Sequence, residues 1–166
     1  IGDSGALPLQ YRLAEGALSV SNDRGELRVT PFTEAAIEVR WLPAGEVEQR
    51  SFAIDAHRET VALSVRQSPD ALHLDTGYLQ VRVEQESLRV SFLRDGEVLL
   101  SEEAGFFHHD VLRGVRFALR DGEQLIGGGA RVLGMNRRGQ RLPLYNKPAY
   151  GYGAGEPVRQ MYYSLP

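Results

Sequence analysis

Residues 72–83 of the chain read LHLDTGYLQVRV, two short runs of alternating apolar and polar residues separated by a turn sequence. Leu72 and Leu74 precede the turn, and Val81 and Val83 follow it. Successive side chains of a strand point to opposite faces, so this period of two predicts strands that each bury one face. The Asp-Thr-Gly between the runs suits a tight reversal, because Asp and Gly tolerate turn conformations. The stretch therefore predicts a β-hairpin.

The same period of two recurs along the chain. Further alternating sets are Ile37/Val39/Trp41, Val61/Leu63/Val65, Leu88/Val90/Phe92 and Val115/Phe117/Leu119, and turn sequences occupy 22–25, 75–77, 94–96 and 121–122. Residues 33–37 could begin a helix, but the β-branched and aromatic residues that follow favour a strand. Short strands that bury one face need a second sheet opposite, which favours an antiparallel sandwich or barrel.

The composition is that of a soluble globular domain. The chain has 166 residues, of which 42% are hydrophobic and 25% are charged, so we expect one domain and no membrane span. It contains no cysteine, which excludes disulfides and thiolate nucleophiles but fits both reducing and oxidising compartments. The start of the sequence reads as a trimmed end. We keep export open and favour a periplasmic or extracellular location over a cytoplasmic one.

The charges are distributed unevenly along the chain. Residues 1–103 carry 10 Arg and no Lys against 18 acidic residues, a balance of −8. Residues 104–166 carry 8 Arg and Lys147 against 4 acidic residues, a balance of +5. Apolar stretches interrupt the basic part, which also lacks an aromatic-basic recognition motif. We therefore expect no nucleic-acid partner.

The residue pattern of the sequence changes after Gly127. Alternation gives way to residues 127–131 (GGGAR), 136–140 (NRRGQ) and 145–152 (YNKPAYGY), and five of the seven tyrosines lie between 145 and 163. Aromatic faces pack against sugar C–H groups, and amide or guanidinium groups pair with sugar hydroxyls. From composition alone, a sugar-binding loop and a small tyrosine core under a long loop are both open, and the core is favoured.

The order of these motifs, followed by MYYSLP at 161–166, resembles the end of the N-terminal domain of glycoside hydrolase family 31. The similarity covers residues 55–166 well and 1–54 loosely. The resemblance implies an all-β fold, an antiparallel β-sandwich of the galactose-mutarotase-like type with a long Gly/Tyr-rich loop near the C-terminus. It also implies that residues 1–166 form a single N-terminal domain, truncated before a catalytic (β/α)8 barrel.

The resemblance further implies a function for the loop. The domain would support the barrel of a retaining α-glucosidase-type enzyme and lend a loop to its substrate pocket. Its partners would be its own barrel and an α-linked oligosaccharide in the parent active site. The substrate-binding residues implied by the resemblance are Asn146, Lys147, Tyr150 and Tyr152.

The chain departs from the family pattern at two positions. Ala130 stands where members commonly have Glu, and Asn-Lys-Pro occupies 146–148 where Asn-Thr-Asp is frequent. Both family aspartates that break the glycosidic bond belong to the barrel, so the resemblance implies no catalytic residue, no cofactor and an inactive isolated chain. Two alternatives concern the parent, which could be an oligosaccharide α-glucosyltransferase or an α-xylosidase. Two others are a stand-alone carbohydrate-binding β-sandwich and a pure scaffold.

Two acidic motifs resemble sites without meeting their geometry. Glu102-Glu103 could suggest the carboxyl pair of a glycosidase, but adjacent strand residues point to opposite faces. The neighbouring histidines of His108-His109-Asp110 diverge in the same way, and no further ligand stands at a zinc-like spacing. We therefore expect no metal site.

Two other motifs suggest anion binding. The run Gly127-Gly128-Gly129 lacks the Gly-Lys-Ser/Thr of a phosphate loop, so close backbone packing is the preferred interpretation. For Arg137, Arg138 and Arg141, we favour pairing with carboxylates of this domain or of the barrel over binding of a free anion.

Overall fold

The computed structural model describes residues 10–49, 59–127 and 134–141. The chain divides into two compact units, Ile1–Ala118 and Leu119–Pro166. Every strand of the described residues lies in the first unit, and none of those residues is helical. Within the described part of the chain, no helix is long and apolar enough to cross a membrane.

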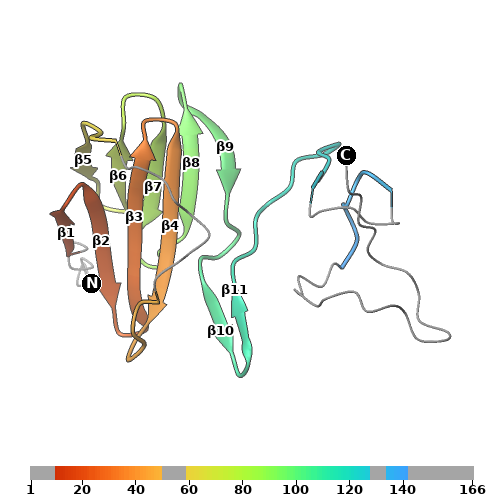
Figure 1. The fold of residues 1–166 in the computed structure, drawn as a ribbon, viewed down its shortest axis with the longest axis horizontal. Helices are drawn as coiled ribbons and strands as arrows, with labels where there is room; N and C mark the ends of the chain where they lie inside the picture. Colours follow the sequence, from red (N-terminus) through yellow and green to blue (C-terminus); the bar gives the residue numbers. More distant parts are fainter. Residues whose placement is uncertain (1–9, 50–58, 128–133, 142–166) are drawn as a thin grey trace, which may run out of the picture. The chain divides into compact units, whose positions relative to one another are not determined.

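The first unit begins with a four-stranded antiparallel sheet, here called the first sheet (Figure 1). Its strands, adjacent in sequence order, are β1 (Tyr11–Ala14), β2 (Ala17–Asn22), β3 (Gly25–Thr33) and β4 (Ala36–Pro43). The predicted turn at 22–25 joins β2 to β3, because the Asn22 side chain accepts the N–H groups of Arg24 and Gly25 at 2.9 and 3.2 Å. The 33–37 run ends β3 and begins β4, so the preference for a strand there is confirmed.

A five-stranded antiparallel sheet, the second sheet, follows in the chain. Its strands are β5 (Ser64–Gln67), β6 (Ala71–Asp75), β7 (Gln80–Glu84), β8 (Val90–Arg94) and β9 (Glu97–Ser101), again in sequence order. The hairpin predicted over residues 72–83 is β6–β7, with Leu72 opposite Val83 and Leu74 opposite Val81. The turn predicted at 94–96 joins β8 to β9, with Asp95 and Gly96 at positive φ.

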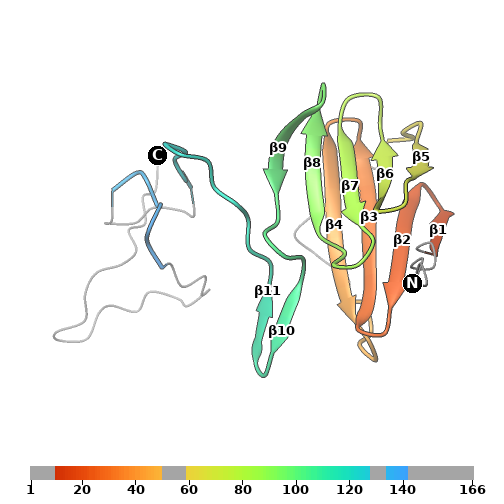
Figure 2. The same cartoon turned by 180° about the vertical axis from the view of Figure 1, so that it is seen from behind.

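The two sheets pack face to face around one apolar core (Figures 1 and 2). The buried members are Leu18, Val20, Leu27 and Val29 from the first sheet, and Leu72, Leu74, Val81, Val83, Leu88 and Val90 from β6, β7, β8 and the turn before β8. Ile37, Val39 and Trp41 pack against them from β4, as their alternation predicted. The prediction of an antiparallel β-sandwich is therefore confirmed.

A hydrogen bond also connects turns of the two sheets. Thr76, buried in the β6–β7 turn, donates its hydroxyl hydrogen to the carbonyl oxygen of Glu34, 2.6 Å away in the β3–β4 turn. The same hydroxyl oxygen accepts the N–H of Leu79 at 2.9 Å. One side chain therefore shapes its own turn and ties it to the other sheet.

The chain after β9 forms a separate hairpin, and here one strand prediction is wrong. Strands β10 (Phe107–His109) and β11 (Leu112–Gly114) pair antiparallel, but the alternating run at 115–119 is not a strand. In that run only Phe117 makes a β-bridge, to Glu102, and Phe117 remains 40% exposed. Alternation produces a strand only where a neighbouring strand supplies hydrogen bonds along its length. For the same reason, β5 includes only Val65 of the predicted 61–65 set.

The described residues of the second unit are held by main-chain contacts. The Arg138 guanidinium donates to the carbonyl oxygens of Arg120 and Glu123 at 2.7 and 2.9 Å. The N–H of Arg137 donates to the carbonyl oxygen of Leu125 at 2.6 Å. Among the described residues Arg138 therefore binds carbonyl oxygens, whereas we favoured pairing with carboxylates of this domain or of the barrel.

Candidate functional site

The predicted sugar-binding residues Asn146, Lys147, Tyr150 and Tyr152 lie outside the described residues, so their role stays a prediction. Ala130 also lies outside them. The described part of the chain offers two polar surfaces, which are the outer faces of the two sheets, and an exposed hairpin.

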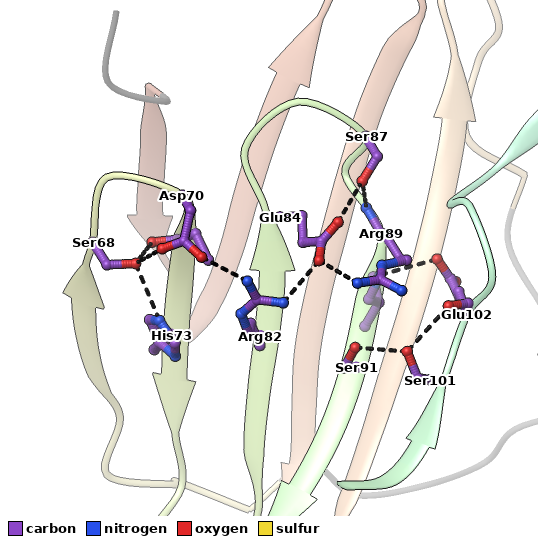
Figure 3. A network of polar contacts seen from close by, with 12 residues as sticks. Ser68, Asp70, His73, Arg82, Glu84, Ser87, Arg89, Ser91, Ser101 and Glu102 are labelled. Atoms are coloured by element: carbon purple, nitrogen blue, oxygen red, sulfur yellow. Dashed lines mark hydrogen bonds and ion pairs between the residues drawn. The ribbon is translucent and has the colours of Figure 1, made fainter. Parts of the chain in front are cut away.

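On the outer face of the second sheet, arginines and carboxylates form a connected ladder (Figure 3). Arg82 donates to Asp70 at 2.7 Å and to Glu84 at 2.8 Å. Glu84 also pairs with Arg89, which follows the β7–β8 turn, and accepts the Ser87 hydroxyl at 3.1 Å. These four contacts pair both guanidinium groups with carboxylates of the same sheet, although the Nε atom of Arg89 is buried without a hydrogen-bond partner among the described residues.

The ladder shifts the acidity of its central carboxylate. The hydrogen bond from Arg89, with those from Arg82 and Ser87, lowers the pKa of Glu84 to about 2, although partial burial opposes the shift. A hydrogen-bonded carboxylate between two cations is stabilised in its charged form. Glu84 is therefore ionised throughout the physiological range and is unsuited to proton transfer at neutral pH.

Glu102 has the opposite environment at the end of the same sheet. Its side chain is only 5% exposed, and one carboxylate oxygen accepts the N–H of Val90 at 3.0 Å. Burial raises the pKa of Glu102, although the Val90 hydrogen bond and the charge of Arg89 oppose the shift. Glu102 completes the hydrogen bonding of β8 just after β9 ends, whereas Glu103 is exposed. Its burial therefore has a structural cause.

Ser68, Asp70 and His73 are the residue types of a hydrolase triad, but their geometry is different (Figure 3). The Ser68 hydroxyl lies 2.7 Å from Asp70 and 3.3 Å from the Nε2 atom of His73. In a triad the carboxylate orients the histidine, whereas Asp70 accepts from Ser68 and Arg82. Burial, with the charges of Arg66 and Arg82, lowers the pKa of His73. The cluster is therefore part of the ladder and does not have the arrangement of a nucleophilic site.

The histidines at the β10–β11 tip form no metal centre with the residues around them. The Nε2 atom of His108 is 2.9 Å from the carbonyl oxygen of Asp110, and that of His109 is 4.0 Å from the Asp110 carboxylate. Among the described residues, no group of three or more His, Cys, Asp or Glu side chains could hold a metal ion.

On the outer face of the first sheet, the register places Arg12, Ser19, Arg28 and Arg40 in one row across all four strands. Arg28 and Arg40 are directly opposed, and Glu48 binds both of them from the segment after β4. Arg28 also pairs with Glu26 at 2.9 Å, and Arg40 with Glu38 at 2.8 Å. Like charges directly opposite each other destabilise a sheet, so Glu48 offsets a repulsion that the register creates.

A cavity of about 330 Å³ lies on this face. Its lining consists of Arg12, Ala14, Glu15, Ala17, Ser19, Arg28, Thr30, Glu38, Arg40 and Glu48. This group is not evident in the sequence because its members are spread over 37 positions and meet only through strand register. The signal for it in the sequence is the polar half of the alternating pattern, which identifies side chains that share the outer face.

Comparisons with known proteins cover most of the chain. Residues 26–166 match the family model described as the glycosyl hydrolase 31 N-terminal galactose mutarotase-like domain. A family 31 dextranase from Flavobacterium johnsoniae, solved in complex with glucose, is similar to the chain with a TM-score of 0.72 and 19% identity. The similarity covers 80% of this chain and 17% of the dextranase, and a mutant of that enzyme complexed with isomaltotriose gives the same values.

A family 31 α-xylosidase from a soil metagenome, complexed with xylose, gives a TM-score of 0.49 and 22% identity. That similarity covers 56% of this chain and 14% of the xylosidase. No curated protein sequence matches the chain at a significant level. The family match extends over most of the chain and includes both sheets apart from β1 and β2. The chain therefore belongs to the family of N-terminal galactose mutarotase-like domains of glycosyl hydrolase 31.

Proposed function

We propose that the chain is the accessory N-terminal domain of a retaining α-glucosidase-type glycoside hydrolase, supporting a catalytic barrel and lending a loop to its substrate pocket. The family match over residues 26–166 is the observation that carries the proposal. The chain spans about a sixth of the dextranase to which it is similar, 17% of that protein's length. The bond-breaking groups would therefore belong to the larger parent protein.

The carboxylates of the described residues support a non-catalytic role for the chain itself. A retaining glycosidase uses one carboxylate as a nucleophile and a second carboxyl group as acid and base, about 5–5.5 Å apart. Glu84 is held ionised by its ion pairs, and Glu102 is enclosed beside β8. Both side chains have structural tasks, so we expect the isolated chain to be inactive.

Exposed apolar side chains support attachment to a larger protein. Val111 and Leu112, at the β10–β11 tip, are 91% and 60% exposed, and Val115 and Phe117 follow them with substantial exposure. Apolar groups gathered in one short segment, flanked by charged residues, are typical of a protein contact surface. We assign this segment, Val111–Phe117, to the contact with the barrel.

The proposed substrate class is supported by the same family. The dextranase structures were solved with glucose and isomaltotriose, which are α-glucan products or fragments. We extend the class of α-linked oligosaccharides to the parent of this chain, with Asn146, Lys147, Tyr150 and Tyr152 as the contacts that its loop contributes. An aromatic face can stack on a sugar ring while amide and ammonium groups bind its hydroxyls.

The test compares the isolated chain with its full-length parent on 4-nitrophenyl α-glucoside and α-xyloside. We expect hydrolysis only by the parent. Hydrolysis by the isolated chain, or its absence in the parent on both substrates, would contradict the proposal.

The loop is tested by replacing Asn146 or Tyr150 by Ala in the parent. We expect KM to rise several-fold for each variant, because substrate contacts are lost while the catalytic carboxylates are untouched. Tyr78→Ala, on a tyrosine of the β6–β7 turn, is the matched control and should leave KM unchanged. Unchanged KM and kcat in both loop variants would leave only the supporting role.

A further inference from the structure

We propose that the cavity on the outer face of the first sheet is a second glycan-binding site, which takes one neutral glucosyl unit of an α-linked oligosaccharide. The ligand class rests on the proposed function. The binding residues do not, because the described lining residues belong to β1–β4, the turn between β1 and β2 and the segment after β4.

The cavity is a trough between two long side chains. Register places Ser19 between Arg12 and Arg28, so the two arginines project from strands on either side of β2. Adjacent strands are about 4.8 Å apart, so their backbones are separated by about 10 Å. Ser19, with Ala14 and Ala17 beside it, is too short to fill the space between them. The resulting opening has the width of a pyranose ring.

The charge balance of the lining selects a neutral ligand. Three arginines and three glutamates line the cavity, so neither a strong anion nor a cation is favoured by the local field. Sugar hydroxyl groups both donate and accept hydrogen bonds, and the lining offers the Arg12 guanidinium as a donor and carboxylate oxygens as acceptors. The buried Ser19 hydroxyl donates to Glu26 at 3.2 Å and belongs to the floor of the trough. A polyhydroxylated neutral ring matches this mixture.

Arg12 is the donor that remains available. It makes no hydrogen bond or ion pair with any residue that the structure describes, whereas Arg28 and Arg40 are held by Glu26, Glu38 and Glu48. The opposite wall is therefore fixed before binding, and only the Arg12 side chain must become ordered. Pre-organised walls reduce the entropic cost of binding. Because none of the described lining residues is aromatic, we expect a dissociation constant in the millimolar range, about −4 kcal/mol.

The experiment is an NMR titration of the ¹⁵N-labelled chain with isomaltotriose, up to about ten times the expected millimolar dissociation constant. We expect saturable shifts in β1–β3. Arg12→Ala should weaken binding at least tenfold, and Ala14→Leu, which narrows the trough from an exposed edge position, should abolish it. Arg66→Ala is the matched control, because Arg66 is an exposed arginine on the outer face of the other sheet.

Each other outcome overturns the proposal. The first is the absence of saturable shifts in β1–β3 of a chain with a folded spectrum. The second is binding that survives both Arg12→Ala and Ala14→Leu. The third is stronger binding of glucuronate or citrate than of isomaltotriose, which would identify an anion site. The titration reads binding at β1–β3, and the proposed function is read by hydrolysis in the parent, so either can fail without the other.

Discussion

The two outer faces of the sandwich both carry arginines and glutamates, but these residues are paired differently on each face. On the second sheet, Arg82 and Arg89 both reach Glu84, and the ladder is closed by contacts within the sheet. On the first sheet, Arg28 and Arg40 face each other across adjacent strands and need Glu48 from the segment after β4. Arg12, at the edge of the row, stays without an ion pair among the described residues.

The difference comes from what stands next to each arginine across the sheet. Arg82 has Glu84 two residues away on its own strand and Asp70 just before the neighbouring strand. Between Arg12 and Arg28 stands the short Ser19. On the second sheet a carboxylate therefore pairs with Arg82 on each side, beside a cavity of about 320 Å³, whereas on the first sheet the short Ser19 leaves Arg12 without such a partner among the described residues. The inner faces share one core, so the outer faces can differ without changing the fold.

The largest effect should come from Gly25→Ala, which tests whether the two sheets depend on each other. Gly25 has a φ of +153°, and an added Cβ would lie 2.2 Å from the carbonyl oxygen of Leu42. We expect a loss of about 3 kcal/mol or more in the free energy of unfolding, measured by urea denaturation. Because the two sheets share one core, the protection of second-sheet amides against hydrogen exchange should fall as well.

Gly96→Ala is the control for this prediction. Its φ is +80°, but nothing lies within 4 Å of an added Cβ, so only the backbone strain of about 1–2 kcal/mol is expected. Unchanged protection of β6–β8 in Gly25→Ala would show that the second sheet is stable alone.

Glu84→Gln breaks the closed ladder. Because the folded pKa of Glu84 is about 2, its stabilisation is complete above the unfolded pKa and is lost as pH falls through about 2. We expect Glu84→Gln to cost about 1–2 kcal/mol at pH 7, after allowance for solvent screening. The difference should shrink on acidification, measured by denaturant unfolding between pH 7 and 2. Glu86→Gln, at an exposed neighbour, should cost nothing measurable, and a pH-independent deficit in Glu84→Gln would contradict the assignment.

Glu102→Gln tests a carboxylate at the end of the same sheet whose pKa is shifted in the direction opposite to that of Glu84. Burial raises the folded pKa of Glu102, so its ionised form lowers stability above that pKa, and stability recovers as pH falls toward the unfolded value. As pH falls from 7 to 4, we expect the free energy of unfolding of the wild type to rise relative to that of Glu102→Gln, by an amount on the order of 1 kcal/mol. If the free energy of unfolding of the wild type and of Glu102→Gln changed in parallel with pH, the cost of burying the charged carboxylate would be fully offset by its hydrogen bond and its neighbours.

Glu48→Gln should have the smallest effect and tests the open face. The side chain of Glu48 is 39% exposed, so its pairs with Arg28 and Arg40 are screened by water and salt. We expect a loss of about 0.5–1 kcal/mol in thermal denaturation at low salt, largely removed at 1 M NaCl. Glu103→Gln, at another exposed glutamate, is the control. A loss of stability that did not depend on salt would indicate that Glu48 contributes through packing and not through its charge.

Alternation was enough to predict strands wherever a neighbour with matching alternation was close in sequence. Leu72/Leu74 and Val81/Val83 stand across one tight turn, and the structure pairs them. The run at 115–119 had the same alternation and failed, because only Phe117 has a bridging partner there. The local pattern specifies which side chains share a face, but it does not supply the adjacent strand.

The polar cavity could not be predicted from the sequence for a related reason. Arg12, Ser19 and Arg28 are separated by two turns, and their alignment depends on the register of two hairpins. A shift of one residue in either hairpin would move Ser19 to the core face. The family resemblance, in contrast, depended on residues 127–166, whose predicted contacts from Asn146 to Tyr152 lie outside the described residues and stay predictions.

The hydrogen bond from Thr76 to Glu34 places unequal demands on the two positions it joins. The donor is a side-chain hydroxyl and the acceptor is a main-chain carbonyl, so any residue at position 34 can accept, while position 76 requires Thr or Ser. Sequence change should therefore be tolerated at 34 and restricted at 76. A library randomised at both positions, selected for folded protein, would retain a hydroxyl residue on one side of the contact and almost any residue on the other.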